Sequence, residues 1–209
     1  MALKDLIIKN RSTRGYDRSR LVKDEEMREM IDCARLSASS MALQPLKFYL
    51  TNDLEECAKI TDNVGFAGAL PGLLPKAGQE PVAYIAICHD KRLYEDDKRF
   101  LKDVGIYAQT ISLAATEMGL NALMIGAFDA EKMRQLLGLP DYFTVLLMMA
   151  VGKSVEHIEL TEIESLQAPE NPAEWEEYRK TDQKMVKYYR KDDVHYVPKR
   201  KLDDFIINK

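Results

Sequence analysis

The residues with the most obvious chemical capacity lie near the start of the chain, in the stretch NRSTRGYD (10–17), where Arg11 and Arg14 enclose Ser12 and Thr13. Guanidinium groups present a planar fork of N–H donors, and hydroxyl groups add further donors close by. Charge-assisted hydrogen bonds of this kind are among the stronger ones in proteins. The stretch therefore predicts a site for phosphate or polyol oxygens, and the alternative is a solvated exit from a helix.

Two further stretches could bind a ligand. The segment LSASSMALQP (36–45) is rich in small and hydroxyl residues and ends in an amide and a proline, and VPKRKL (197–202) is a basic cluster. Taken separately, the first could be an ordinary helix-terminating turn and the second a solvated tail. Only their joint order with Arg11–Arg14 favours a shared binding function.

The motifs that are missing narrow the chemistry. His89, His157 and His195 are far apart and lack metal-ligand spacing, so no metal site is expected. The segment VGKS (151–154) fails as a phosphate-binding loop because Leu147 stands where a glycine is needed. There is also no GxGxxG after the first expected strand, no GxSxG, and no nucleophile with a base at hand. If the chain is an enzyme, its chemistry is expected to belong to a bound cofactor.

Composition and charge place the chain among ordinary globular proteins. It has 209 residues, of which 46% are hydrophobic and 31% charged, which fits one domain with a substantial core. The net charge of −4 offers no general attraction for nucleic acid or an anionic membrane. No signal-peptide or membrane-spanning run is present, and the three cysteines lack a CxxC pair, so we expect a cytoplasmic protein.

The elements that must position these stretches can be read from hydrophobic spacing. Helices are expected over 2–10, 24–37, 53–62, 100–118 and 129–138. Asp24 is a plausible N-cap, and Gly119 and Gly138 end the last two of these helices. Strands are expected over 46–51, 82–90, 121–128 and 143–152, with a long loop over 63–81. This alternation predicts an α/β or α+β domain.

The order of these stretches, together with the segment 103–140, resembles the nitroreductase family of flavin enzymes from Arg11 to about Phe205. The resemblance implies an α+β fold: a three-layer sandwich of a mixed, mainly antiparallel sheet wrapped by helices, in an intertwined homodimer with FMN at the subunit interface. It also implies hydride transfer from NADH or NADPH to FMN, and from there to a small nitroaromatic, quinone-like or related acceptor.

The first motif carried over from the family is its RRSxR stretch. Arg11, Ser12 and Arg14 match it, with Thr13 at its variable position. In the family, these side chains hold the FMN phosphate, the ribityl chain and the N1/O2 edge of the ring. Positive charge at that edge would favour the anionic reduced flavin.

The second motif is the family's PSxxNxQPW turn, which the partner subunit contributes. Ser39, Ser40, Met41, Ala42 and Gln44 match this turn, followed by Pro45 and Leu46. Alanine replaces the family's asparagine at position 42, and leucine replaces its tryptophan at position 46. Asn10 likewise replaces the first arginine of the RRSxR stretch.

Two more segments complete the implied cofactor site. Gly126 and Ala127 match the place where family backbone amides approach flavin N5, and small residues allow that approach. Lys199 and Arg200, or Lys201 if the register slips by one, match a basic pair on the phosphate. No side chain is assigned a catalytic role, because the chemistry would take place on the flavin.

The C-terminal part is expected to be an arm. The chain is treated as one FMN-binding domain over 1–209, in which 155–209, with Trp175, Tyr188 and Tyr189, wraps the partner subunit. Three hypotheses for function follow. The first is an FMN-dependent NAD(P)H oxidoreductase, the second is a specialised or non-catalytic flavin-binding protein, and the third is an interaction domain without flavin.

Overall fold

The computed structural model describes residues 2–66, 75–163, 171–174 and 188–207. The chain divides into two compact units. The described residues of the first unit lie in 2–66 and 75–156, and those of the second lie within 157–207.

The centre of the first unit is a four-stranded sheet in the order β1-β2-β4-β3. Its strands are β1 (Leu46–Thr51), β2 (Ala83–Asp90), β3 (Asn121–Ile125) and β4 (Phe143–Gly152). All neighbouring strands are antiparallel, so this sheet is not mixed as the resemblance implied. The four strands expected from the sequence are confirmed, although the third ends at Ile125, three residues earlier than predicted.

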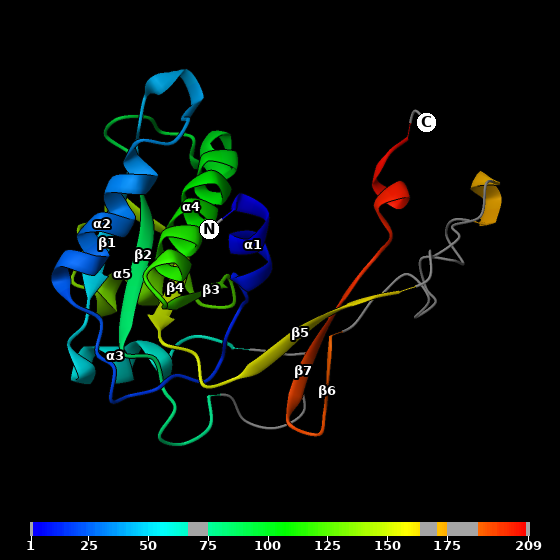
Figure 1. The fold of residues 1–209 in the computed structure, drawn as a ribbon. Helices are drawn as coiled ribbons and strands as arrows, with labels where there is room; N and C mark the ends of the chain where they lie inside the picture. The colour runs from blue at the N-terminus through cyan, green and yellow to red at the C-terminus, as the bar shows by residue number, and fades with distance from the viewer. Residues whose placement is uncertain (1, 67–74, 164–170, 175–187, 208–209) are drawn as a thin grey trace. The chain divides into compact units, whose positions relative to one another are not determined.

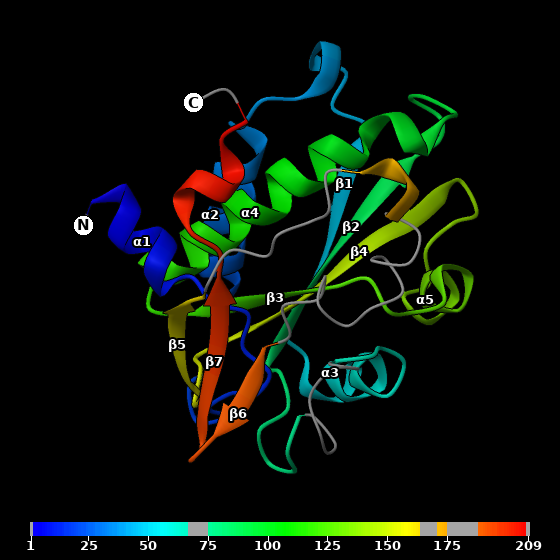
Figure 2. The ribbon, with the colours of Figure 1, turned by 90° about the vertical axis from the view of Figure 1, so that its right-hand side faces the viewer.

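Helices cover both faces of this sheet, as Figure 1 and Figure 2 show from two sides. One face packs against α2 (Asp24–Arg35) and α4 (Leu101–Glu117), and the other against α3 (Leu54–Thr61) and α5 (Ala130–Leu136). The helix α1 (Leu3–Lys9) lies beside α4. Short 3₁₀ turns occupy Ser40–Ala42 and Asp97–Phe100. The first unit is therefore a three-layer α+β arrangement, as predicted.

The strand β2 shows why the sheet is covered twice. All eight of its residues are buried. Ile85 and Ile87 point into the core with α2 and α4, whereas Tyr84 and Cys88 point into the core with α3 and α5. Because side chains alternate between the faces of a strand, a continuous apolar run requires a layer on each side.

Helix ends follow local capping chemistry, with one correction. The carboxylates of Asp53 and Asp129 accept N–H bonds from Glu56 (2.8 Å) and Lys132 (2.9 Å), and so cap α3 and α5. Asp24, however, is the first residue of α2, and Lys23 occupies the N-cap position. The prediction of Asp24 as the cap was wrong by one residue.

The second unit contains a three-stranded sheet that the sequence patterns did not predict. Its strands, in the order β5-β7-β6, are β5 (His157–Glu162), β6 (Tyr189–Lys191) and β7 (Val194–Lys199). The pair β5–β7 is parallel, and β6–β7 is an antiparallel hairpin. Further 3₁₀ turns cover Pro172–Glu174 and Leu202–Phe205. Trp175 lies outside the described residues.

The hairpin of the second unit is stabilised by its turn and by ring contacts. Asp192 and Asp193 have φ angles of 50° and 59°, which the short side chain of Asp tolerates in a two-residue turn. The rings of Tyr189 and Tyr196 stack across the two strands at 5.1 Å. Over the described segments, no helix has the length and apolar character needed to span a bilayer.

Candidate functional site

Arg11 lies just past α1 and has an incompletely bonded guanidinium group. One terminal nitrogen donates to the carbonyl oxygen of Ile7 (2.6 Å), while the buried Nε has no hydrogen-bond partner in the described structure. Burial lowers the pKa of Arg11, because it disfavours the charged form. Its charge meets no carboxylate at ion-pair distance among the described residues. A partly desolvated cation with an unused donor is suited to an anionic ligand.

Ser12 is exposed, whereas the next two residues of the stretch are directed inward. The buried hydroxyl of Thr13 bonds to the Ser154 hydroxyl (2.7 Å) and donates to Glu156 Oε2 (3.1 Å). The guanidinium of Arg14 donates to the carbonyl oxygens of Phe66 (3.3 Å) and Ser12 (3.2 Å). Within the described residues, the Thr13 side chain therefore makes hydrogen bonds inside the protein, and Arg14 links the stretch to the backbone of Phe66.

Glu156 fixes the backbone of this stretch. Its Oε2 accepts a short bond from the backbone N–H of Arg14 (2.5 Å) in addition to the Thr13 hydroxyl. The neighbouring backbone is also bonded to the body of the unit, through Tyr16 N–H to Gln79 (2.9 Å) and Val155 N–H to Gly15 (3.1 Å). The conformation of the Arg11–Arg14 stretch thus rests on several bonds at once.

The segment Gly126–Ala127, after β3, is held near Arg14 through residues 65 and 66. Gly65 N–H donates to the Ala127 carbonyl (2.7 Å), and a Cβ on Gly65 would lie 3.1 Å from the Ala127 Cβ. Apart from its two chain neighbours, a Cβ on Gly126 would meet no atom of the described residues within 4 Å. This exposed backbone therefore offers an open surface on which a planar ligand can lie close.

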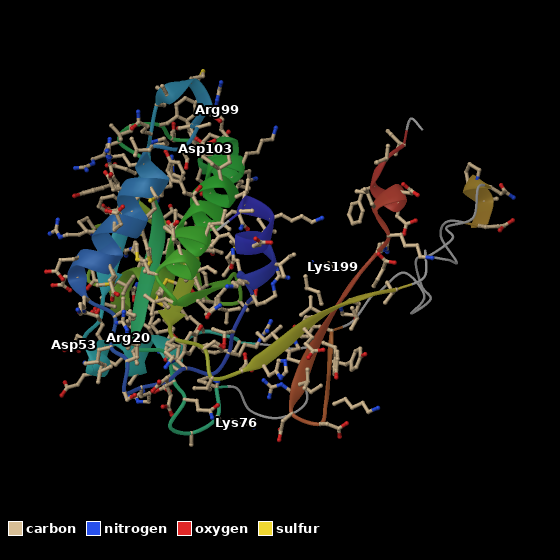
Figure 3. All side chains as sticks on the ribbon, viewed as in Figure 1. Arg20, Asp53, Lys76, Arg99, Asp103 and Lys199 are labelled. Carbon is tan, nitrogen blue, oxygen red and sulfur yellow. The ribbon has the colours of Figure 1, made fainter. Side chains whose placement is uncertain are left out.

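The turn over residues 39–44 is anchored to α4 by the buried carboxylate of Asp103. Asp103 Oδ2 accepts from the Ser39 hydroxyl and the Ser40 N–H, both at 2.8 Å, and Oδ1 accepts from the Ser40 hydroxyl at 2.7 Å. Asp103 lies in the first turn of α4, where the helix dipole also favours negative charge. Figure 3 labels this residue.

The anchored turn has an unusual backbone. Met41, Ala42 and Gln44 have φ angles of 52°, 52° and 49°, in the left-handed region that non-glycine residues rarely adopt. Each such residue costs about 1–2 kcal/mol, whereas hydrogen bonds to a charged group contribute about 1.5–3 kcal/mol each. The bonds to Asp103 are therefore of the right size to offset the strain of the turn.

A second contact reaches the same turn from the 3₁₀ turn Asp97–Phe100, which directly precedes α4. A terminal nitrogen of Arg99 lies 3.2 Å from Met41 Sδ, and the other lies 3.0 Å from the hydroxyl of Tyr94. Figure 3 shows Arg99 and Asp103 at the same end of α4. The side chains of Met41 and Ala42 are exposed at the tip of this turn, as is that of Gln44.

The basic pair expected on the phosphate belongs to the second unit. Lys199 is the last residue of β7, and its carbonyl accepts the Ile163 N–H (2.9 Å). Lys199 and Arg200 are exposed, and Lys201 is half-buried. The structure brings Arg14 close to residues 126–127 and secures 39–44 on α4, but the pair 199–200 is described only within its own unit.

Sequence patterns missed the residues that support the site, namely Asp103, Glu156, Gly65 and Phe66. No local signal distinguishes Asp103 from the capping residues Asp53 and Asp129. The thiols give no alternative nucleophile, because burial raises the pKa of Cys57 and Cys88 to about 12 and also raises the pKa of Cys33. In the described segments, no three His, Cys, Asp or Glu side chains gather as metal ligands would.

Comparison with known proteins identifies the family. The sequence model of the nitroreductase family matches residues 7–153, which include the Arg11–Arg14 stretch, the 39–44 turn and Gly126–Ala127. The chain belongs to the nitroreductase family. It is therefore a member of a family of oxidoreductases.

Individual relatives of this nitroreductase-family chain are distant. It is 28% identical over 153 residues to a provisionally named NADH dehydrogenase/NAD(P)H nitroreductase of Archaeoglobus fulgidus, covering 70% of this chain and 82% of the relative. A nitroreductase family protein of Streptococcus pneumoniae is similar in structure, with a TM-score of 0.64, 19% identity, and coverage of 83% and 97%. An FMN-dependent nitroreductase of Clostridium difficile gives a TM-score of 0.60, 22% identity, and coverage of 86% and 97%. These structures confirm the α+β fold.

Proposed function

We propose that this nitroreductase-family chain is an FMN-dependent oxidoreductase that takes hydride from NADH or NADPH and reduces a small nitroaromatic or quinone-like acceptor. The observation that carries the proposal is the open backbone at Gly126, held next to a stretch whose Arg11 has an unused buried donor. A flat, phosphorylated cofactor needs both features. The names of the similar proteins, one FMN-dependent and one an NAD(P)H nitroreductase, support the same assignment.

The residues present fit FMN. Arg11 and Ser12 would bind its phosphate and ribityl oxygens, and the buried Arg14 would place its charge near the N1/O2 edge of the ring. The backbone of Gly126 and Ala127 would lie against the ring, where any larger side chain at 126 would compete for the same space. Bound FMN supplies the capacity to accept and pass on hydride, which no side chain of this chain offers.

We also propose a homodimer in which a second copy contributes the 39–44 turn, and Lys199 and Arg200, to the site. The helix α1 buries none of its residues within the described chain, and Leu3, Ile7 and Ile8 on it are exposed. Exposed apolar side chains on one short helix are typical of a surface that a partner covers. Light scattering is expected to give twice the chain mass, and a flavin-loaded monomer would contradict the dimer.

The direct test is the visible spectrum of the purified protein, followed by NADH or NADPH under nitrogen. Flavin absorption that bleaches on adding the nicotinamide, and returns with a nitroaromatic or quinone, is expected. A colourless protein that also fails to bind added FMN would refute the proposal.

Gly126→Val makes the test specific to the site. Because no atom of the described residues beyond the chain neighbours lies within 4 Å of the added Cβ, the fold should tolerate valine. FMN binding should weaken by roughly a hundredfold or more, the effect of a steric block at a ligand face. The matched control is Ala58→Val on the exposed surface of α3, which should leave FMN affinity unchanged. Unchanged affinity in Gly126→Val would place the ring elsewhere.

A second candidate is a flavin-binding protein with little reductase activity. The observation that favours it is Ala42, which places a methyl group where the family's asparagine would meet the polar edge of the flavin. This candidate predicts bound FMN that neither nicotinamide reduces at a useful rate. Turnover of a few per second or faster with a common acceptor would exclude it.

A further inference from the structure

The turn over 39–44 has very few hydrogen bonds to the other residues that the structure describes. Its internal bonds run from Ala42 N–H to the Ser39 carbonyl (3.1 Å), from Leu43 N–H to the Ser40 carbonyl (3.2 Å), and from Gln44 Nε2 to the Ala42 carbonyl (3.3 Å). Among the described residues, its side chains and amides bond outside the turn only to Asp103 and Arg99. The strand pairing of β1 begins only at Leu46.

Asp103 is the stronger of the two contacts. Its carboxylate is 1% exposed, and both oxygens accept hydrogen bonds from Ser39 and Ser40. The contact from Arg99 is made by an exposed side chain to a thioether sulfur, which is a weak acceptor. The left-handed residues immediately after Ser40 leave the turn strained, so it needs a fixed point at its start.

We propose that Asp103 is a positioning residue for the flavin site. Its buried carboxylate holds Ser39 and Ser40, and through them sets the place of Met41 and Ala42, which the flavin would meet across the subunit interface. The inference rests on the proposed function, because it assigns Asp103 a role only through the turn that contacts the cofactor. Asp103 itself would touch neither flavin nor substrate.

Asp103→Asn tests this assignment with little change of shape. The amide keeps one oxygen acceptor and presents an NH₂ donor at the other position, so the serine hydroxyl there must turn from donor to acceptor, and the remaining bonds lose the charge that strengthens them. The matched control is Asp53→Asn, because Asp53 also accepts an N–H at a helix start but lies far from the turn (Figure 3). Asparagine is an equally good cap, so this control should behave as wild type.

The first measurement is hydrogen exchange of residues 36–44 in the FMN-free protein. The Ser40 amide donates to Asp103 Oδ2, so its exchange should become about tenfold faster in Asp103→Asn and stay unchanged in Asp53→Asn. Ser40→Ala removes the hydroxyl bond alone and should give a smaller acceleration, which keeps the test available if Asp103→Asn folds poorly. Equal exchange in all four proteins would overturn the anchoring.

The second measurement is FMN affinity by quenching of flavin fluorescence. Asp103→Asn should bind FMN about tenfold more weakly and alter the visible absorption of the bound flavin, since the turn no longer meets the ring in one place. Arg99→Met should change the affinity about twofold or less, because its contact is exposed. Faster exchange with wild-type affinity and spectrum would overturn the positioning role.

The two measurements separate the inference from the function on which it rests. If the wild-type protein binds no FMN, the proposed function fails and so does the role of Asp103 at the flavin. The exchange data would still decide whether Asp103 anchors the turn. If the wild-type protein binds FMN and the Asp103→Asn protein matches it in every readout, only the positioning role fails.

Discussion

The Arg11–Arg14 stretch and the 39–44 turn both carry residues matched to the family's flavin site. Each is held by one carboxylate, but they differ in how many other hydrogen bonds support them. Glu156 holds the Arg11–Arg14 stretch, whose neighbours also bond to the backbone near the sheet. In the part of the chain that the structure describes, Asp103 and the weaker contact of Arg99 are what hold the 39–44 turn. A carboxylate that accepts hydrogen bonds therefore leaves a segment rigid where other bonds also hold it. Where other bonds are few, the same contact leaves the segment sensitive to mutation.

The largest effect on stability is expected from overpacking at Gly152, next to Tyr16, which follows the Arg11–Arg14 stretch. A Cβ on Gly152 would lie 2.8 Å from the ring of the buried Tyr16 and 3.2 Å from Val82. Gly152→Val should therefore lower the free energy of unfolding by about 3 kcal/mol, which urea denaturation can measure. Gly126→Ala is the stability control, because its added Cβ meets open space. A well-folded Gly152→Val protein of normal stability would show that the packing around Tyr16 can adjust, which would contradict the rigidity of this region.

The next effect compares the two carboxylates directly. Glu156→Gln removes a charged acceptor from two donors and should lower the free energy of unfolding by about 2 kcal/mol, because residues 13–16 belong to the core. Asp103→Asn should lower it by only about 1 kcal/mol, since the strain of the exposed turn is released at the same time. Equal losses in both variants would contradict the proposed difference between the turns.

A smaller effect of opposite sign is expected at Ala42. Glycine adopts a φ of 52° without strain, so Ala42→Gly should stabilise the protein by up to about 1 kcal/mol despite the added freedom of the unfolded chain. Ala38→Gly is the matched control: residue 38 has no left-handed φ, so glycine there should bring no gain. Thermal unfolding measures the stability of both variants. A loss of stability in Ala42→Gly would show that the backbone at residue 42 is not strained.

The smallest effect concerns pH, through His89 near the start of α4. His89 is fully buried, its ring nitrogens have no hydrogen-bond partner in the described structure, and it stacks on Phe100 at 5.7 Å. Burial lowers the pKa of His89, opposed in part by Asp97, Asp90 and Asp96, while Lys91 adds to the lowering. The folded state then binds the proton more weakly than the unfolded state.

Stability should accordingly fall as the pH drops below the unfolded-state pKa of about 6.5, and the His89 contribution should be constant above it. His89→Phe should reduce this dependence between about pH 5 and 7, as seen in unfolding curves at several pH values. Hydrogen exchange in the same range should rise in 39–44 before it rises in 11–16. An identical pH profile in wild type and variant would exclude His89 as the cause.

The elements of the first unit were largely predictable, because each depends on neighbours in the sequence. The spacing of apolar residues predicted α2, α4 and all four strands of the first sheet, since burial on one face imposes that period. The strands β5, β6 and β7 were missed because their patterns are short: β5 alternates only two apolar residues with polar ones, and β6 has three residues, too few to show a period. The site was predictable only where residue type alone suggests a ligand, as in Arg11–Arg14.

The sequence by itself determined that anion-binding side chains follow the first helix, that a small hydroxyl-rich turn follows the second, and that apolar strands are covered on both faces. Only the tertiary structure decided which carboxylates hold these segments. Asp103 meets Ser40 across 63 residues, and Glu156 meets Arg14 across 142. Contacts between such distant residues depend on how the layers pack, and local patterns of spacing hold no information about them.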